Sequence, residues 1–252
     1  MKKIHNSKFS RHIKFYVSAL ILMMIANVAS AHYIWIETGS SGKIGQPQEV
    51  KIYYGEYNEG KREIKGGRLD ELKGIEAWLI DPDGNRTALK VSLEDKFFKT
   101  AFTPSKAGEY YIMAVNKVVE VKDWSKHDIG IVKPMFYASK KISVQTNVHK
   151  PLNVLELPDL TIVPVENKNS KEPSFKLYFK GLPLSNGKVF FHAPNEWSKE
   201  LKTDNEGIVS FNPLWKGLYV IECIHVEKTP GKFKDKNYEA IRHRATSMIT
   251  IE

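Results

Sequence analysis

LYVIECIHV (residues 218–226) and EAIRHRATSMITI (residues 239–251) are two runs rich in β-branched and apolar residues, separated by the turn-forming segment TPGKFKDKN (residues 229–237). Two such runs around a Pro-Gly turn predict an antiparallel hairpin. In a hairpin centred near residue 234, the residue numbers of two facing residues always add up to about twice 234. His225 and His243 satisfy that sum, so they are predicted to be cross-strand neighbours.

The same hairpin face carries carboxylates beside the two histidines. Glu227 lies two residues after His225, and Glu239 lies four residues before His243. Side chains an even number of residues apart on a strand point to the same face, so two imidazoles and two carboxylates should gather at the loop end of the hairpin. Imidazole nitrogens suit nickel, copper or cobalt better than calcium or magnesium, and a carboxylate adds a ligand or orients a ring. The alternative interpretation is a His–Glu hydrogen bond that binds no metal ion.

The remaining sequence consists mainly of short β-rich runs between turn signals, which predicts an all-β protein. We expect two consecutive β-sandwich units: an immunoglobulin-like unit at residues 32–148 and a smaller unit at residues 173–252, joined by residues 149–172. The single cysteine, Cys223, lies in an apolar strand pattern and is predicted to be buried, with a role as a soft metal ligand as the alternative. Glu56 follows a strand and is expected on an exposed loop.

Three short segments of the second unit form a recognisable pattern: Gly181-Leu182-Pro183, Thr203-Asp204-Asn205-Glu206-Gly207 and Gly217-Leu218-Tyr219. This pattern resembles the prealbumin-like and carboxypeptidase-regulatory-like β-sandwich. The resemblance implies a fold and no activity.

Residues 1–31 have the pattern of a secretory signal peptide: a basic start, an apolar stretch, and Ala29-Ser30-Ala31 before His32. Cleavage there predicts a periplasmic or secreted protein. The apolar stretch is short for a membrane span and nothing later reaches spanning length, so no span is expected after cleavage. Without the five basic residues of this segment the formal net charge falls from +9 to +4. With no dense Lys/Arg run, nucleic acid is not an expected partner.

Cleavage would also give His32 two nitrogen ligands, its imidazole and a free α-amine. An α-amine has a pKa of about 8 and can lose its proton to a metal ion near neutral pH. We therefore group His32 with His225 and His243 as candidate ligands of one nitrogen-rich metal site, with Glu227 or Glu239 as a further ligand or orienting group.

Both ends of the predicted mature chain carry further motifs. Ala31-His32-Tyr33-Ile34-Trp35-Ile36-Glu37 resembles the "AH-x-x-W-x-E" start of the periplasmic proteins known as cobalt/nickel transport periplasmic components (nickel-uptake substrate-specific region). Residues 225–231 and 238–246 resemble the C-terminal block of that family. The resemblance spans essentially the whole mature chain. It implies a periplasmic binding or delivery role and supplies no established set of ligands.

These observations lead to one preferred function and two alternatives. The preferred function is a periplasmic binding and delivery protein for a late transition-metal ion, nickel or cobalt favoured, that feeds a membrane importer. A copper-binding histidine-brace chaperone uses the same ligands. An envelope-interaction or glycan-binding module needs no metal ion. We predict no enzyme, because the sequence has no nucleophile elbow, no HExxH motif and no Cys–His pair with an orienting residue.

Overall fold

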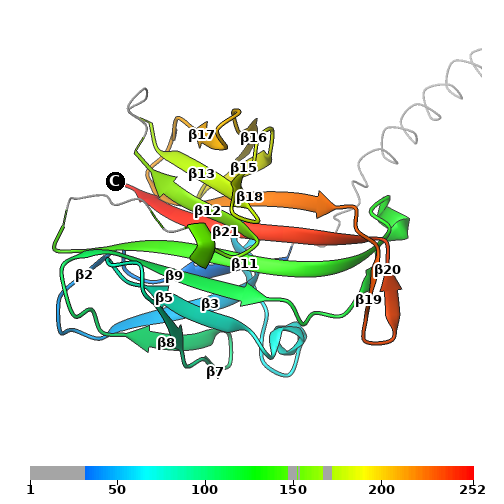
Figure 1. Ribbon diagram of the computed structural model, residues 1–252, viewed down its shortest axis with the longest axis horizontal. Coiled ribbons are helices and arrows are strands. Elements are labelled where there is room, and N and C mark those ends of the chain that lie inside the picture. The colour runs from blue at the N-terminus through cyan, green and yellow to red at the C-terminus, as the bar shows by residue number, and fades with distance from the viewer. Residues whose placement is uncertain (1–31, 147–151, 153, 167–171) are drawn as a thin grey trace, which may run out of the picture. The chain divides into compact units, whose positions relative to one another are not determined.

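A ten-stranded sheet runs through the middle of the computed structural model, which describes residues 32–146, 152, 154–166 and 172–252 (Figure 1). The predicted signal peptide lies outside the described residues. In spatial order the sheet contains β16 (Ser198–Lys202), β15 (Lys188–His192), β18 (Gly217–Glu227), β21 (Ala240–Ile251), β11 (Ile131–Val144), β9 (Gly108–Asn116), β5 (Glu76–Ile80) and β6 (Arg86–Leu89), and β2 (Ser41–Gly42) and β10 (Lys122–Asp123) pair with β11.

A smaller sheet packs against each face of this central sheet. The first contains β1 (Tyr33–Glu37), β3 (Gln48–Glu56), β8 (Phe98–Phe102) and β7 (Ser92–Leu93), with β4 (Lys61–Arg62) paired to β3. The second contains β12 (Leu160–Val165), β13 (Ser174–Phe179) and β14 (Leu182–Pro183), with β17 (Ile208–Ser210) paired to β13. A separate hairpin consists of β19 (Gly231–Phe233) and β20 (Lys236–Tyr238).

Side chains of the central sheet alternate between two hydrophobic cores. On β9, Tyr110 and Ile112 join the core shared with β1, β3 and β8, whereas Tyr111 and Met113 join the core shared with β12 and β13. This alternation is the period-two geometry of a strand that is buried on both faces. The prediction of an all-β sandwich is therefore confirmed.

Helix is limited to four short 3-10 segments in the described ranges: η1 (Tyr57–Glu59), η2 (Arg68–Leu72), η3 (Ser125–His127) and η4 (Val154–Glu156). None of the helices in the described part of the chain has the length and hydropathy needed to cross a membrane.

The predicted C-terminal hairpin has the expected register. β18 and β21 pair antiparallel with His225 opposite His243, as the constant-sum rule requires. β21 also pairs in parallel with β11, with Tyr137 opposite Ala245. That parallel pairing joins strands from both sides of the expected connecting segment at residues 149–172 into one continuous sheet, so the two expected units share their central layer.

Strand β1 is held on one side by a strand and on the other by side chains. It pairs antiparallel with β3, and β3 is its one strand partner in the described sheets. Two carbonyls on its other edge accept hydrogen bonds from β21: Arg244 Nη1 donates to His32 O at 3.0 Å, and Thr246 Oγ1 donates to Ile34 O at 2.6 Å. These bonds satisfy buried main-chain groups that would otherwise lack partners.

Candidate functional site

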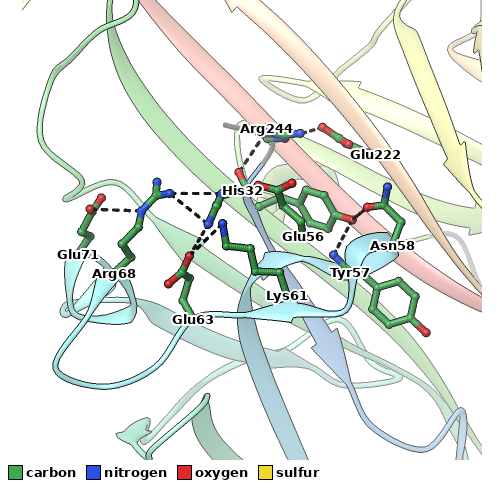
Figure 2. A network of polar contacts seen from close by, with 11 residues as sticks. His32, Glu56, Tyr57, Asn58, Lys61, Glu63, Arg68, Glu71, Glu222 and Arg244 are labelled. Atoms are coloured by element: carbon green, nitrogen blue, oxygen red, sulfur yellow. Dashed lines mark hydrogen bonds and ion pairs between the residues drawn. The ribbon is translucent and has the colours of Figure 1, made fainter. Parts of the chain in front are cut away.

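His32 directly precedes β1 and is buried, with 3% of its surface exposed. Its Nδ1 lies 2.7 Å from Oε1 of Glu56, and its Nε2 lies 2.5 Å from Oε1 of Glu63. Glu56 ends β3 and Glu63 follows β4, so both carboxylates come from the paired segment beside β1. Figure 2 shows the imidazole of His32 among these acidic groups, with Arg68 on its other side.

The local strand pairing explains why these groups meet. Tyr33 faces Gly55 in the antiparallel β1–β3 register, and one further step brings His32 opposite Glu56. Gly55 has a φ of 148°, and a Cβ at that position would lie 2.1 Å from Lys61 O. Glycine therefore lets β4 approach β3 closely, and this approach carries Glu63 to the second nitrogen of the ring.

Burial favours the neutral form of the His32 ring. Burial lowers the pKa of the His32 ring, Glu63 opposes that effect, and the positive charge of Arg68 adds to it. The Nη1 atom of Arg68 lies 3.1 Å from Nε2 and 3.5 Å from Nδ1. A neutral imidazole carries one N–H and one lone pair. The shorter contact of Nε2, to Glu63 at 2.5 Å, favours a proton on Nε2, and this leaves the lone pair on Nδ1, on the side of Glu56 and 3.5 Å from the Arg68 donor.

A third carboxyl group adds to the acidic character of the site. The Glu56 carboxylate and, to a smaller extent, burial raise the pKa of Glu59. Glu56 is 3% exposed, so the expectation that it lies on an exposed loop is wrong. It is buried because it ends a strand that packs against the central sheet, rather than following one.

The structure brings His225 and His243 together on the opposite face of β21 from Arg244. Their ring centroids are 6.3 Å apart. Nδ1 of His243 lies 2.8 Å from Tyr137 Oη, and its Nε2 lies 3.1 Å from Glu227 Oε2. Burial lowers the pKa of His243 and Glu227 opposes that effect. A neutral ring with a proton on Nε2 satisfies both contacts, so both nitrogens of His243 are engaged.

The five residues predicted as one site therefore lie in three places. Because successive residues of a strand point to opposite faces, His243 and its neighbour Arg244, which contacts His32, face different cores. Glu239 accepts a hydrogen bond from Ile131 N at 3.1 Å, next to the start of β11. Within the described residues, no group of three or more His, Cys, Asp or Glu side chains is arranged to hold a metal ion by itself.

Two other features lie apart from His32. Cys223 is fully buried, as predicted, and burial raises the pKa of its thiol to about 12. An open cavity of about 910 Å³ is lined by Ser41, Lys43, Gln46 and Ser143 among others, and its lining contains no histidine. Neither feature adds a ligand to the acidic site around His32.

Three solved structures show a distant likeness to this chain. The chain resembles a DUF4785 family protein from Legionella pneumophila subsp. pneumophila str. Philadelphia 1 at 11% identity, covering 78% of this chain and 53% of that chain, with a TM-score of 0.31. It also resembles the BSP domain of a biofilm associated protein (11% identity, 85% and 29% covered, TM-score 0.23). A third likeness is to trypsin-activated alpha-2-macroglobulin from Escherichia coli (13% identity, 88% and 16% covered, TM-score 0.28).

The chain thus spans about half or less of the length of each of these three structures. A search of curated proteins gave no match. One family model covers most of the chain, at residues 29–227, and its range includes His32, Glu56 and Glu63. The chain belongs to the family described as Domain of unknown function (DUF4198).

Proposed function

We propose that the processed protein binds a late transition-metal ion at its N-terminal residue and delivers it to a membrane importer, in the cell envelope. His32 would supply the α-amine and Nδ1 as a chelate, and Glu56 would supply an oxygen ligand. Glu63 would hold the ring through Nε2. This ligand set differs from the set expected from the sequence: Glu56 takes the place of His225 and His243 as a ligand, and Glu63 takes the place of Glu227 or Glu239 as the orienting group.

One observation carries the proposal. Nδ1 of His32 and Oε1 of Glu56 are 2.7 Å apart, and when Nε2–H donates to Glu63 both of these facing atoms are acceptors. Two buried acceptors at this distance need a proton or a metal ion between them. Two ligand atoms about 2.0 Å from one ion, at a right angle to each other, lie about 2.8 Å apart. The observed separation of Nδ1 and Oε1 fits two ligand atoms bound at a right angle to one ion.

The donor set selects among metals. A right-angled N,N,O arrangement suits Ni²⁺, Cu²⁺ or octahedral Co²⁺ better than tetrahedral Zn²⁺, in which ligand atoms lie farther apart. The His32–Glu63 contact has the form of the carboxylate–histidine–metal arrangement, in which the second ring nitrogen donates to a carboxylate and fixes the ring. The family resemblance at Ala31–Glu37 favours nickel or cobalt over copper as the cargo.

Titration calorimetry with Ni²⁺, Co²⁺ and Cu²⁺ tests the proposal on protein that has been exported and trimmed to start at His32. We expect micromolar or tighter binding of at least one of these ions, and loss of that binding in His32→Ala. Glu56→Gln should weaken it at least tenfold, and Glu63→Gln by about 10–100-fold. Glu49→Gln is the matched control, because Glu49 lies on the same strand but is exposed and pairs with Lys99.

The outcomes separate the alternatives. Binding no tighter than millimolar for all three ions would refute the proposal. Selective Cu²⁺ binding, with nitrogen hyperfine structure in the EPR spectrum, would identify a copper-binding brace instead of a nickel or cobalt carrier. Equal binding by Glu49→Gln and Glu56→Gln would show that Glu56 is not a ligand.

An interaction module is the second candidate, and it has its own observation. Trp197 and Trp215 are each 37% exposed, their ring centroids are 5.4 Å apart, and neighbouring Leu214 is 63% exposed. Exposed aromatic side chains are common at binding surfaces. The two rings are inclined at 62° and form no flat platform for a sugar face. A change of tryptophan fluorescence on adding envelope glycans, absent in Trp215→Ala, would support this role.

A further inference from the structure

Three side chains of the central sheet, those of Arg244, Glu222 and His192, form a chain of contacts that ends at the main chain of His32. Arg244 on β21 donates from Nη1 to His32 O at 3.0 Å and from Nε to Glu222 Oε1 at 2.5 Å (Figure 2). Glu222 on β18 contacts His192 Nε2 on β15 through Oε2 at 2.9 Å. Arg244 is 4% exposed and Glu222 is 2% exposed. Arg244 thus reaches the carbonyl of His32, whereas Glu56 and Glu63 reach its ring.

The contacts at the ring and at the carbonyl of His32 also restrain its α-nitrogen. The Cα atom of an amino acid has a rigid tetrahedral arrangement of substituents. The two glutamates hold the side chain at both ring nitrogens, and Arg244 holds the carbonyl. With these two substituents of Cα held, the direction of the third, the α-nitrogen, is determined. A chelate of amine and Nδ1 needs both nitrogens to be held in fixed directions, and this restraint removes the cost of ordering the α-nitrogen when an ion binds.

Arg244 is itself held firmly. Its guanidinium lies 5.1 Å from the centroid of the Tyr33 ring, and that ring stacks on His192 with centroids 6.2 Å apart. Burial alone would raise the pKa of Glu222, but Arg244 and His192 lower it to about 2, so Glu222 remains ionised at neutral pH. A permanently charged partner restrains the guanidinium through a charge-assisted hydrogen bond.

We propose that Arg244, braced by Glu222, is the positioning residue of the N-terminal metal site: it orients the α-amine of His32 toward the ion without touching the ion. This inference rests on the proposed function. A neighbouring bond allows the positioning role to be separated from general support of β1, because Thr246 donates to the carbonyl of Ile34, two residues along the same strand edge from His32.

The experiment compares wild type, Arg244→Met, Arg244→Lys and Thr246→Val, each exported and trimmed to start at His32, with Cu²⁺ alone as the probe. Affinity is measured by titration, fold by circular dichroism, and coordination by EPR. We expect Arg244→Met to bind Cu²⁺ about tenfold more weakly or worse, because the chelate must then be ordered on binding. Arg244→Lys should recover part of that loss, and Thr246→Val should stay within about twofold of wild type.

The EPR spectrum provides a readout that mere destabilisation would not change. Wild type and Thr246→Val should show coupling to the amine and imidazole nitrogens together, and Arg244→Met should lose one of them. Equal affinity and spectra in wild type and Arg244→Met would overturn the positioning role. So would equal weakening in Thr246→Val and Arg244→Met, which indicates general loosening of β1. If Arg244→Met does not fold, Arg244→Lys takes its place, and its Cu²⁺ affinity and EPR spectrum are compared with those of wild type and Thr246→Val. No Cu²⁺, Ni²⁺ or Co²⁺ binding by wild type would refute the proposed function and this inference with it.

Discussion

Glu222→Gln removes the negative charge from a buried ion pair and should destabilise the protein strongly. The side chains of Glu222 and Arg244 are 3% and 4% exposed, so no water replaces the lost carboxylate. Breaking one partner of a buried pair costs about 3–5 kcal/mol, because the remaining charge is left uncompensated. In a domain of this size each kcal/mol shifts the melting temperature by about 2–4 °C, so a fall of about 6–20 °C is expected.

Thermal and urea unfolding, followed by circular dichroism, measure this loss. The double variant Glu222→Leu with Arg244→Met should lose less stability than Glu222→Gln alone, since apolar replacement of both partners leaves no buried charge. Glu49→Gln, in an exposed pair, should leave the melting temperature unchanged within error. A loss of less than about 1 kcal/mol in Glu222→Gln, or a double variant less stable than the single one, would contradict this account of the pair.

Three further predictions concern other buried groups. Lys133→Met should destabilise the protein by about 2–4 kcal/mol in urea unfolding, because the buried Nζ of Lys133 donates to the carbonyls of Lys117 and Val119 at 2.7 and 2.6 Å, beside the Phe233 ring; an unchanged midpoint would contradict this. Cys223 should not react with a thiol reagent until the protein unfolds, since its thiol is buried and its pKa is raised to about 12. Burial lowers the pKa of His243 below its ordinary value of 6.5. The unfolded chain therefore takes up more protons, and stability present above pH 6.5 should fall as pH drops below it. His243→Gln should reduce that pH dependence in unfolding measured at pH 7.5 and 5.5.

The sequence was most informative for the β18–β21 pair, whose connection at residues 228–239 itself folds back as the β19–β20 hairpin. The pairing of His225 with His243 follows from the spacing of one hairpin, and the structure has that register. The same rule would have placed Glu56 opposite His32, because β1 and β3 also form an antiparallel pair. The connection between them contains β2, which pairs with β11 instead, so no tight turn marks this pair in the sequence.

Long-range pairing was beyond the reach of local patterns. The parallel contact of β11 with β21 joins strands about a hundred residues apart, and no turn specifies it. That pairing decides which face of β21 meets β1, so it also decides that Arg244, and not His243, contacts His32. The contact of Glu63 with His32 could not be predicted from the sequence pattern either, because Glu63 reaches the ring through the close approach of β4 to β3 that Gly55 permits.

The placement of the charged network argues for a role beyond stability. A buried ion pair stabilises a fold no better than a well-packed apolar pair, so stability alone is a weak reason for Arg244 and Glu222. Chain termini are usually the least ordered part of a domain. Here His32, the residue expected to follow the cleavage site, is held at its carbonyl from the central sheet and at both ring nitrogens by carboxylates. If Arg244 only helped β1 to pack, a contact with the ring or with the edge of β1 would suffice, and Thr246 already bonds to that edge at Ile34 O. Restraint of both the ring and the carbonyl is what a terminal chelate requires, which is why the Arg244 and Thr246 variants are the decisive comparison.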